Sequence, residues 1–461
     1  MLANLNTTDT LVNLNPKTDM GGLASFEQLS AHISADHLAS ILTRLVDTAS
    51  PTGEEGPLAR EIVTILEEYN LEGKEQVIDT QQSNAIGKIS GETENSGRNL
   101  LLYAPIDTVT SNNAEEDLPW LSNSEELPSE ARAQTRFNGE FLTGLGAHNP
   151  KGHAACIIEA ARVLKNSGIS LGSDLLLGFG AGGMPSDARQ GTRKDSGHGA
   201  GCAHILAHRA DYEFAPDCAL IAKSGWSISY EEVGLIWFEV VVEGIHNYSG
   251  ARHLMPYKNP ILDASALMLK LDQWLQDWPK KYESGLVAPQ GVISFIESGW
   301  ERMPSFTPEV CRFRVDLRLS PRTTGKRAEE AFASALKEFS EELGIQTGYK
   351  TLVCIPGTST PPNEPIISQS IKSWEEINQK PHAFIEGMSG ATDANILRAG
   401  GLPTARVGLP KADIPDINFQ RGMNTVAIKD LVKLTQLLIH VALNICGQTN
   451  GRKTSAGVTH G

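Results

Sequence analysis

The residues best suited to chemistry follow an apolar run and lie in a glycine-rich turn. Asp107 comes shortly after residues 100–103, whose side chains are apolar or aromatic. His148 and Lys151 lie in the turn at residues 144–152. A carboxylate beside an imidazole or an amine transfers protons in general acid–base catalysis. This set predicts a proton-transfer site. The alternatives are packing of a turn and a helix cap for His148, and a surface position at a helix start for Lys151.

A second polar segment lies late in the chain. Ser389 and Gly390 belong to the sequence Gly-Met-Ser-Gly, which offers a hydroxyl group and backbone amides to a bound anion. The segment lacks the Gly-x-Ser-x-Gly spacing of a nucleophilic serine. His204 and His208 are four residues apart without a glutamate between them, so we interpret them as packed or solvated helix residues.

These residues need strands and helices that position them. Apolar runs at residues 100–103, 175–179 and 219–222 alternate with segments of helical periodicity. Strands alternating with helices predict an α/β domain with a mostly parallel sheet. We assign this domain to residues 35–228 and 347–446.

The pattern changes between these two parts. From Cys311 to Arg318, apolar residues alternate with charged ones, which indicates a sheet with one solvated face. Residues 229–346 are therefore expected to form an inserted α+β domain. Residues 1–34 are expected to be a loosely attached arm, residues 111–136 a surface loop, and residues 447–461 a disordered tail.

Composition narrows the classes of partner. The 461 residues carry a formal net charge of −15, which argues against nucleic acid and anionic membranes. We find no apolar run of about 18 residues and no signal peptide. The six cysteines form no Cys-x-x-Cys pair. We therefore expect six buried thiols and a cytoplasmic protein.

Several short motifs occur in one order and together resemble a known family. They are Ser-Pro-Thr-Gly-Glu from residue 50, Asp-Thr-Val from residue 107, Gly-x-Gly-Ala-x-x-x-Lys-Gly from residue 144, Gly-Ile-His from residue 244 with Asn259, Asp-Leu-Arg-Leu-Ser-Pro from residue 316, and Gly-Ala-Thr-Asp-Ala from residue 390. Over about residues 37–445 the chain resembles the zinc amidohydrolases of the glutamate carboxypeptidase, acetylornithine deacetylase, succinyl-diaminopimelate desuccinylase and aminoacylase family. The resemblance implies a phosphorylase/hydrolase-like catalytic domain and an inserted ferredoxin-like dimerisation or lid domain.

The resemblance also implies a pair of zinc ions, but most of the ligand positions differ. Pro105 replaces a histidine, and Asn149 replaces the bridging aspartate. Residues 180–184 lack the Glu-Glu pair, and Gln420 is our best match to a late histidine. Asp217 is the one candidate ligand retained. Without these donors no metal ion and no other cofactor is expected.

The family also suggests roles for residues that remain. His246 would stabilise an oxyanion across a dimer, unless it is a lone surface histidine. Arg318 would hold a substrate carboxylate, with a strand-surface ion pair as the alternative. Lys151 and Lys223 could supply positive charge in place of zinc. Further substrate-binding residues would be Asn259, Ser389, Gly390, Thr392 and Asp393.

Together these points predict an enzyme that acts without zinc on an amide-type C–N bond of a small carboxylate-bearing compound. Asp107 with a nearby histidine or lysine would move the proton. A non-catalytic binding or regulatory protein is the first alternative, and a metal-dependent hydrolase with rearranged ligands the second. A homodimer is expected.

Overall fold

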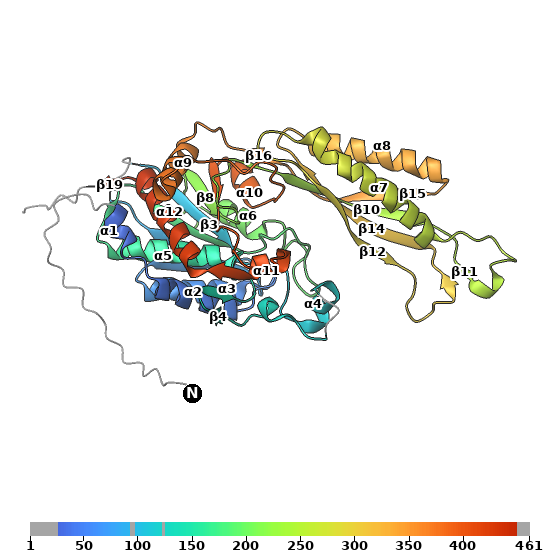
Figure 1. The fold of residues 1–461 in the computed structure, drawn as a ribbon, viewed down its shortest axis with the longest axis horizontal. Helices are drawn as coiled ribbons and strands as arrows, with labels where there is room; N and C mark the ends of the chain where they lie inside the picture. Colours follow the sequence, from blue (N-terminus) through green and yellow to red (C-terminus); the bar gives the residue numbers. More distant parts are fainter. Residues whose placement is uncertain (1–25, 93–96, 122–124, 450–461) are drawn as a thin grey trace, which may run out of the picture.

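The computed structural model describes residues 26–92, 97–121 and 125–449. The chain forms a large α/β body and an elongated domain that projects from it (Figure 1). The predicted fold class, an α/β domain with an inserted α+β domain, is confirmed. Most of the predicted N-terminal arm and of the C-terminal tail lies outside the described residues.

The main sheet has the strand order β1-β2-β7-β3-β8-β17. The strands are β1 (Glu72–Val77), β2 (Ser83–Ile89), β3 (Leu100–Pro105), β7 (Leu175–Gly180), β8 (Cys218–Ala222) and β17 (Thr404–Val407). The four strands β7, β3, β8 and β17 are parallel, and β1 and β2 are antiparallel additions. Every residue of β3, β7 and β8 is buried, because helices cover both faces of the sheet.

Alternate residues of β3 point into two different cores. Leu100 and Leu102 pack against helices on one face, whereas Leu101 and Tyr103 face the other. The first face is covered by α2 (Ala35–Asp47), α3 (Gly56–Glu68), α5 (Lys151–Asn166) and α12 (Ile428–Cys446), with α1 (Phe26–Ser30) and α9 (Pro365–Asn378) beside them. The second face is covered by α6 (Ala200–Ala207) and α10 (Ala394–Ala399).

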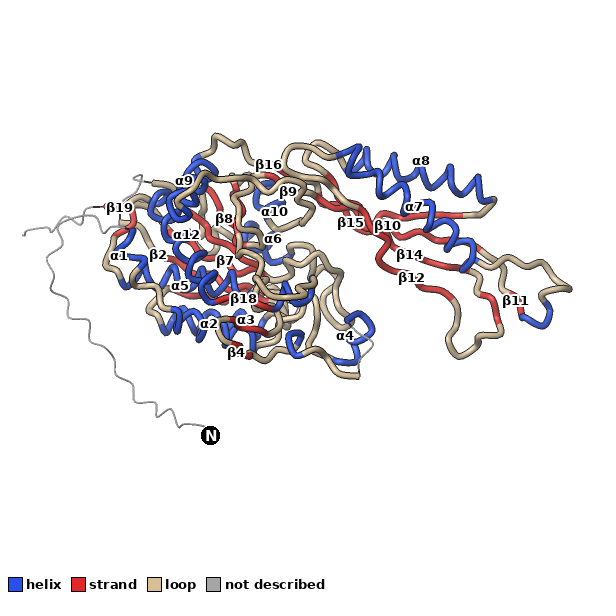
Figure 2. The backbone as a smooth tube through the Cα atoms, in the orientation of Figure 1, coloured by secondary structure: helices blue, strands red, loops and turns tan. Residues whose placement is uncertain are grey.

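The projecting domain is an antiparallel sheet backed by two helices (Figure 2). Its strand order is β12-β14-β10-β15. The elements are β10 (Gly234–Glu243), α7 (Pro260–Tyr282), β12 (Gly291–Ser298), β14 (Val310–Leu319), α8 (Gly325–Leu343) and β15 (Thr347–Ile355). Since β15 pairs with β10, this lid domain extends to Ile355 and not to residue 346 as predicted.

Smaller elements connect these parts. They are α4 (Ala114–Leu121), η1 (Ser129–Ala131), β4 (Arg136–Asn138), β5 (Phe141–Thr143), β6 (Ser170–Leu171), β9 (Glu231–Glu232), β11 (Asn247–Tyr248), η2 (Ser249–Ala251), β13 (Phe306–Thr307), β16 (Thr358–Ser359), α11 (Phe419–Asn424), β18 (Thr425–Ala427) and β19 (Gln448–Thr449). The segment predicted as a surface loop thus contains α4 and η1.

Three further expectations are refined by the packing. Leu29 of α1 is buried in the main core, so the described end of the predicted arm is firmly packed. All six cysteines are free, but Cys354 is exposed and only the other five are buried as predicted. Among the described residues, no helix is long and apolar enough to cross a membrane.

Candidate active site

The candidate site lies at the carboxyl edge of the main sheet. Because β3, β7 and β8 are parallel, the segments that follow them meet at this edge. Asp107 follows β3, Gly183 follows β7 and Lys223 follows β8. Asp393 joins them from the residue before α10. The fold therefore brings together two of the predicted site residues, Asp107 and Asp393, and Lys223, which was expected to supply positive charge.

Asp107 is completely buried, and both of its carboxylate oxygens are engaged. Oδ1 accepts hydrogen bonds from the backbone amides of Gly183 (2.8 Å) and Met184 (3.2 Å). Oδ2 accepts from Thr52 Oγ1 (2.7 Å) and from the Met184 amide (3.0 Å). Burial raises the pKa of Asp107, and Lys223 opposes that rise. These contacts hold the backbone after β7, and a role for Asp107 in proton transfer stays a prediction.

Glu55 is a second buried acid at this edge and is not among the residues predicted from the sequence. Its Oε1 accepts from the backbone amides of Gly53 (3.0 Å) and Gly182 (2.8 Å), and its Oε2 accepts from Gln82 Nε2 (3.1 Å). Burial and the nearby Asp107 raise its pKa to about 8, so Glu55 is protonated at neutral pH. Its position directly after the Ser-Pro-Thr-Gly-Glu motif was the available signal.

Asp393 is the carboxylate that reaches a cavity. It lines, with Met184, His198, Leu235 and Thr392, a cavity between the main body and the lid domain, here called the junction cavity. Its Oδ2 accepts a hydrogen bond from the hydroxyl of Tyr103, over 2.7 Å. Burial raises the pKa of Asp393 to about 6, against the opposing effects of Lys223 and Tyr103.

Lys223 carries the positive charge of the cluster. Its side chain is buried, and Nζ lies 3.4 Å from the carbonyl oxygen of Gly183 and 3.7 Å from Met184 Sδ. Burial lowers the pKa of Lys223, while Asp393 and Asp107 both act to raise it. The ammonium group thus partly neutralises two buried carboxylates.

A pair of zinc ions does not fit these residues. A Cβ atom on Gly183 would lie 2.4 Å from Pro105 Cβ and 2.6 Å from Asp393 Oδ2, so no ligand side chain has room there. The ammonium of Lys223 stands among the carboxylates and would repel a dication. Among the residues that the structure describes, no three His, Cys, Asp or Glu side chains are grouped to hold a metal ion.

Asp217, the candidate ligand taken from the sequence, lies at the other end of the sheet. It precedes β8, and its Oδ2 accepts from the backbone amide of Asn99, which precedes β3, over 2.8 Å. The interpretation of Asp217 as a retained ligand is therefore corrected. Asp217 was matched to a family ligand position, but it precedes β8, whereas the site lies where β8 ends.

A second cavity lies on the other side of Met184. Thr108, Leu145, Asn149, Met184, Gln420 and Met423 are among its lining residues, and it is here called the amide cavity. It contains Asn149 and Gln420, the residues that the family resemblance matched to two zinc-ligand positions. Since Met184 lines both cavities, they adjoin at this side chain.

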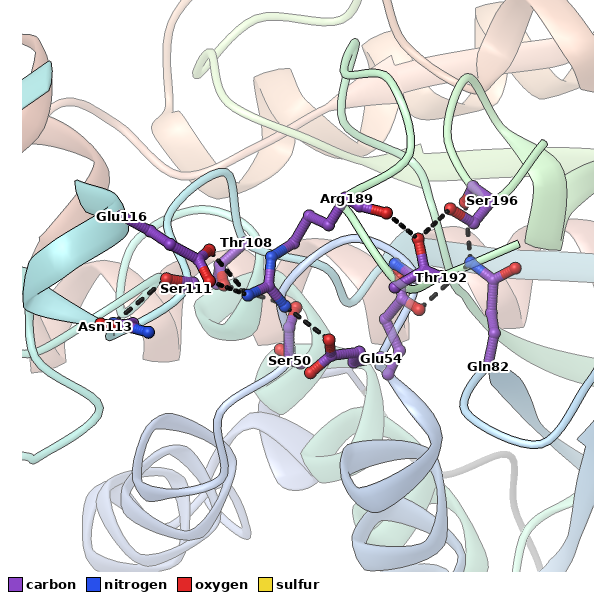
Figure 3. A network of polar contacts seen from close by, with 12 residues as sticks. Ser50, Glu54, Gln82, Thr108, Ser111, Asn113, Glu116, Arg189, Thr192 and Ser196 are labelled. Carbon is purple, nitrogen blue, oxygen red and sulfur yellow. Dashed lines mark hydrogen bonds and ion pairs between the residues drawn. The ribbon is translucent and has the colours of Figure 1, made fainter. Parts of the chain in front are cut away.

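The loop after β7 is tied to the main body by a polar network (Figure 3). Arg189 donates to Glu54 Oε1 and Glu116 Oε2, both over 2.7 Å. Gln82 Nε2 donates to the carbonyl oxygen of Ser196, over 2.7 Å. These contacts hold the loop that forms the wall between the two cavities.

His148 and Lys151 are buried away from the acidic cluster. Lys151 Nζ donates to the carbonyl oxygen of Thr48 over 2.7 Å, and burial lowers its pKa to about 7. His148 Nε2 contacts the carbonyl oxygen of Pro410 over 2.9 Å, and its ring meets the edge of His153. The structure therefore does not bring the Lys151 ammonium to Asp107.

His246 lies far from the cluster of its own chain. It precedes β11 near the tip of the lid domain (Figure 1) and is exposed. Its Nδ1 contacts the carbonyl oxygen of Thr307 over 3.0 Å, and its ring stacks on Phe306. Within one chain this residue has no access to the site.

Two other predicted residues of the lid domain have structural partners. Arg318 Nη2 donates to Asp316 Oδ2 over 2.7 Å, which is the strand ion pair named as its alternative. Asn259 caps α7, and its side chain accepts from the Ile261 amide over 3.0 Å.

The late polar segment joins the two domains. Ser389 Oγ accepts from the backbone amide of Gln290 over 3.0 Å, and Gly390 is exposed. Thr392 lines the junction cavity, and its hydroxyl accepts from the Ala394 amide over 3.2 Å. Of this segment, Thr392 and Asp393 reach a cavity of the site.

Comparisons with known proteins agree with this architecture. Residues 230–343 match a family model described as a peptidase dimerisation domain. The fold is similar to that of human carnosine dipeptidase 1, with 12% identity, a TM-score of 0.69, and coverage of 92% of this chain and 99% of the other.

Two further solved structures show the same likeness. Aminopeptidase PepT from Bacillus cereus is 16% identical with a TM-score of 0.61, covering 90% and 99% of the two chains. An M20 family metallo-carboxypeptidase from Sulfolobus solfataricus is 13% identical with a TM-score of 0.62, covering 88% and 98%. At these identities the likeness shows the fold.

Proposed function

Because this chain has the fold of the M20 peptidases and carries a peptidase dimerisation domain, we propose that it acts on an amide-type C–N bond of a small carboxylate-bearing compound. The reaction proceeds without a metal ion. One observation carries this proposal. Asp393 is a carboxylate with a pKa of about 6 that lines a cavity between the two domains, beside a buried cation.

In this proposal Asp393 is the general base. At neutral pH it is ionised, and a pKa close to the working pH suits a base that must both take up and release a proton. It removes a proton from the water that attacks the amide carbonyl carbon. The same proton then passes to the leaving nitrogen as the C–N bond breaks. Tyr103 holds the carboxylate in place by a hydrogen bond, and the charge of Lys223 favours its ionised form.

We further propose a homodimer that assembles through the lid domain, supported by the match to a dimerisation domain. His246 of a second copy would then stabilise the oxyanion, because its own chain holds it far from the site. The free thiols support a reducing compartment, the cytoplasm.

The test combines metal analysis with a screen of N-acyl amino acids and small amides. We expect less than one zinc ion per chain and turnover that a chelator leaves unchanged. Asp393→Asn should lower kcat by about 100-fold or more. Two tightly bound zinc ions per chain at the candidate site would overturn the proposal that the reaction needs no metal ion.

A second candidate is a non-catalytic binding protein. The observation that favours it is Asp107, whose two oxygens are engaged by backbone amides and a hydroxyl and are shielded from both cavities. In that case a ligand binds in the junction cavity and no substrate is turned over. Asp393→Asn then changes only the affinity for that ligand.

A further inference from the structure

The amide cavity combines an apolar wall with uncharged polar groups. Its apolar part includes Leu145, Met184 and Met423, and its polar side chains include Thr108, Asn149 and Gln420. No charged side chain is among the described residues that line it. A charged ligand group would lose its hydration here without gaining an ion pair, so this cavity favours a neutral group.

Two of the polar atoms have no partner within the described protein. Asn149 is 7% exposed; its Nδ2 contacts Met423 Sδ over 3.4 Å, and its Oδ1 accepts no hydrogen bond. Gln420 Nε2 is shielded from solvent and donates none. Buried polar atoms without partners are rare because each is costly to desolvate, and their presence marks a place where a ligand or water completes the bonding.

We propose that this cavity binds an uncharged amide group of the ligand. The carbonyl oxygen of that group accepts a hydrogen bond from Gln420 Nε2, and its N–H donates to Asn149 Oδ1. A carboxylate cannot donate to Asn149, and an ammonium cannot accept from Gln420. One unpartnered acceptor and one unpartnered donor on two residues that line the same cavity therefore select a carboxamide, N-acyl or ureido group.

The inference deepens the proposed function, and its meaning for turnover rests on that proposal. Met184 separates the amide cavity from the junction cavity with Asp393. A ligand anchored by one amide group in the amide cavity can extend past Met184. Its cleavable bond then lies beside Asp393 in the junction cavity. Asn149 and Gln420, which the family resemblance matched to zinc-ligand positions, would in this protein bind the substrate.

The first experiment compares two probes of similar shape, isobutyramide and isobutyrate, by ligand-observed NMR with the full chain. We expect at least a tenfold preference for the amide. Asn149→Leu and Gln420→Met replace the unpartnered groups by apolar side chains of similar size. Each should lower the affinity for isobutyramide about tenfold, the usual effect of one hydrogen bond.

The thermal midpoint of the same variants shows whether Asn149 and Gln420 serve ligand binding or only the stability of the fold. Removing an unpartnered buried polar atom should leave the thermal midpoint of the free protein unchanged or raise it. Asn378→Leu is the matched control, because Asn378 lies in α9 away from this cavity, its Nδ2 donates to the Trp374 carbonyl and its Oδ1 accepts from Trp226 Nε1. It should lower the thermal midpoint and leave isobutyramide binding unchanged. If Asn149→Leu does not fold, Asn149→Ser withdraws the acceptor with less change in packing.

The inference would be overturned if both probes bound equally, or if isobutyramide binding were unchanged in both variants. The unpartnered atoms would then be satisfied by water. The result is also distinct from the proposed catalysis. Loss of amide binding in a protein without turnover supports the amide site and contradicts the enzyme. Turnover that depends on Asp393, with KM unchanged in both variants, contradicts the amide site and supports the enzyme.

Discussion

The hydroxyl group of Tyr103 donates a hydrogen bond to Asp393 Oδ2 over 2.7 Å, and both side chains are buried. Tyr103 lies on the central strand β3, and Asp393 precedes α10 on the second face of the sheet. Gly180 makes room for the contact, since a Cβ atom there would lie 1.9 Å from the tyrosine hydroxyl. The pair fixes the one buried carboxylate of this cluster that lines the junction cavity.

Tyr103→Phe should shift the acid limb of kcat/KM to higher pH. Burial raises the pKa of Asp393 to about 6, and the tyrosine hydrogen bond opposes that rise. Removing the donor raises the pKa further, so a smaller fraction of the base is ionised at any pH near the limb. Turnover well above the limb should change less. A limb that stays in place would show that Asp393 is not the titrating base.

Glu55→Gln should flatten the dependence of stability on pH. The pKa of Glu55 is raised from 4.5 to about 8, so the folded protein binds an extra proton between these values. This contribution is complete below pH 4.5 and is lost as pH rises through 8, by at most about 1.4 kcal/mol per pH unit. Urea unfolding at several pH values measures the slope.

The control for this slope is Glu68→Gln. The hydrogen bond from Arg44 lowers the pKa of Glu68, although burial opposes it, so its contribution changes only below about pH 4.5. Glu68→Gln should leave the slope between pH 5 and 8 as it is. If Glu55→Gln also leaves it unchanged, the extra proton is not on Glu55.

Lys223→Met should destabilise the fold, because it removes the cation whose charge opposes that of two buried carboxylates. Adding Asp393→Asn should recover a large part of that loss. Lys151→Met is the matched control, since Lys151 is equally buried but donates to the Thr48 carbonyl. Urea unfolding of the single and double variants gives the coupling. Additive effects for Lys223 and Asp393 would contradict an ionic role for this lysine.

Arginine on the outer edge of the lid sheet should convert the proposed dimer to a monomer. The edge strand β12 exposes Val292 and Ile296, each by 51%. Val292→Arg with Ile296→Arg places two charges where a second copy would pack. Val77→Arg, on the edge strand β1 of the main sheet, is the control. Light scattering at micromolar concentration measures the mass in solution. A wild-type monomer would contradict the dimer and also the proposal that His246 of a second copy stabilises the oxyanion.

The sequence by itself determined the class of fold. Apolar runs and helical periodicity are local, so they predicted the central strands and the helices of both domains. Residue types also led to the prediction that Pro105, Asn149 and Gln420 stand where the resembled family has zinc ligands. Residue types did not show where the strand pairing of the lid sheet ends. The predicted domain boundary at residue 346 therefore excluded β15.

The tertiary structure decided which of the polar residues meet. Asp393 pairs with Tyr103, Glu55 contacts the backbone at Gly182, and Lys223 replaces Asp217 as the charged group at the site. These contacts join segments up to 290 residues apart in sequence, and no local pattern encodes them. They follow from parallel strand order, which gathers the carboxyl ends at one edge and places Asp217 at the other.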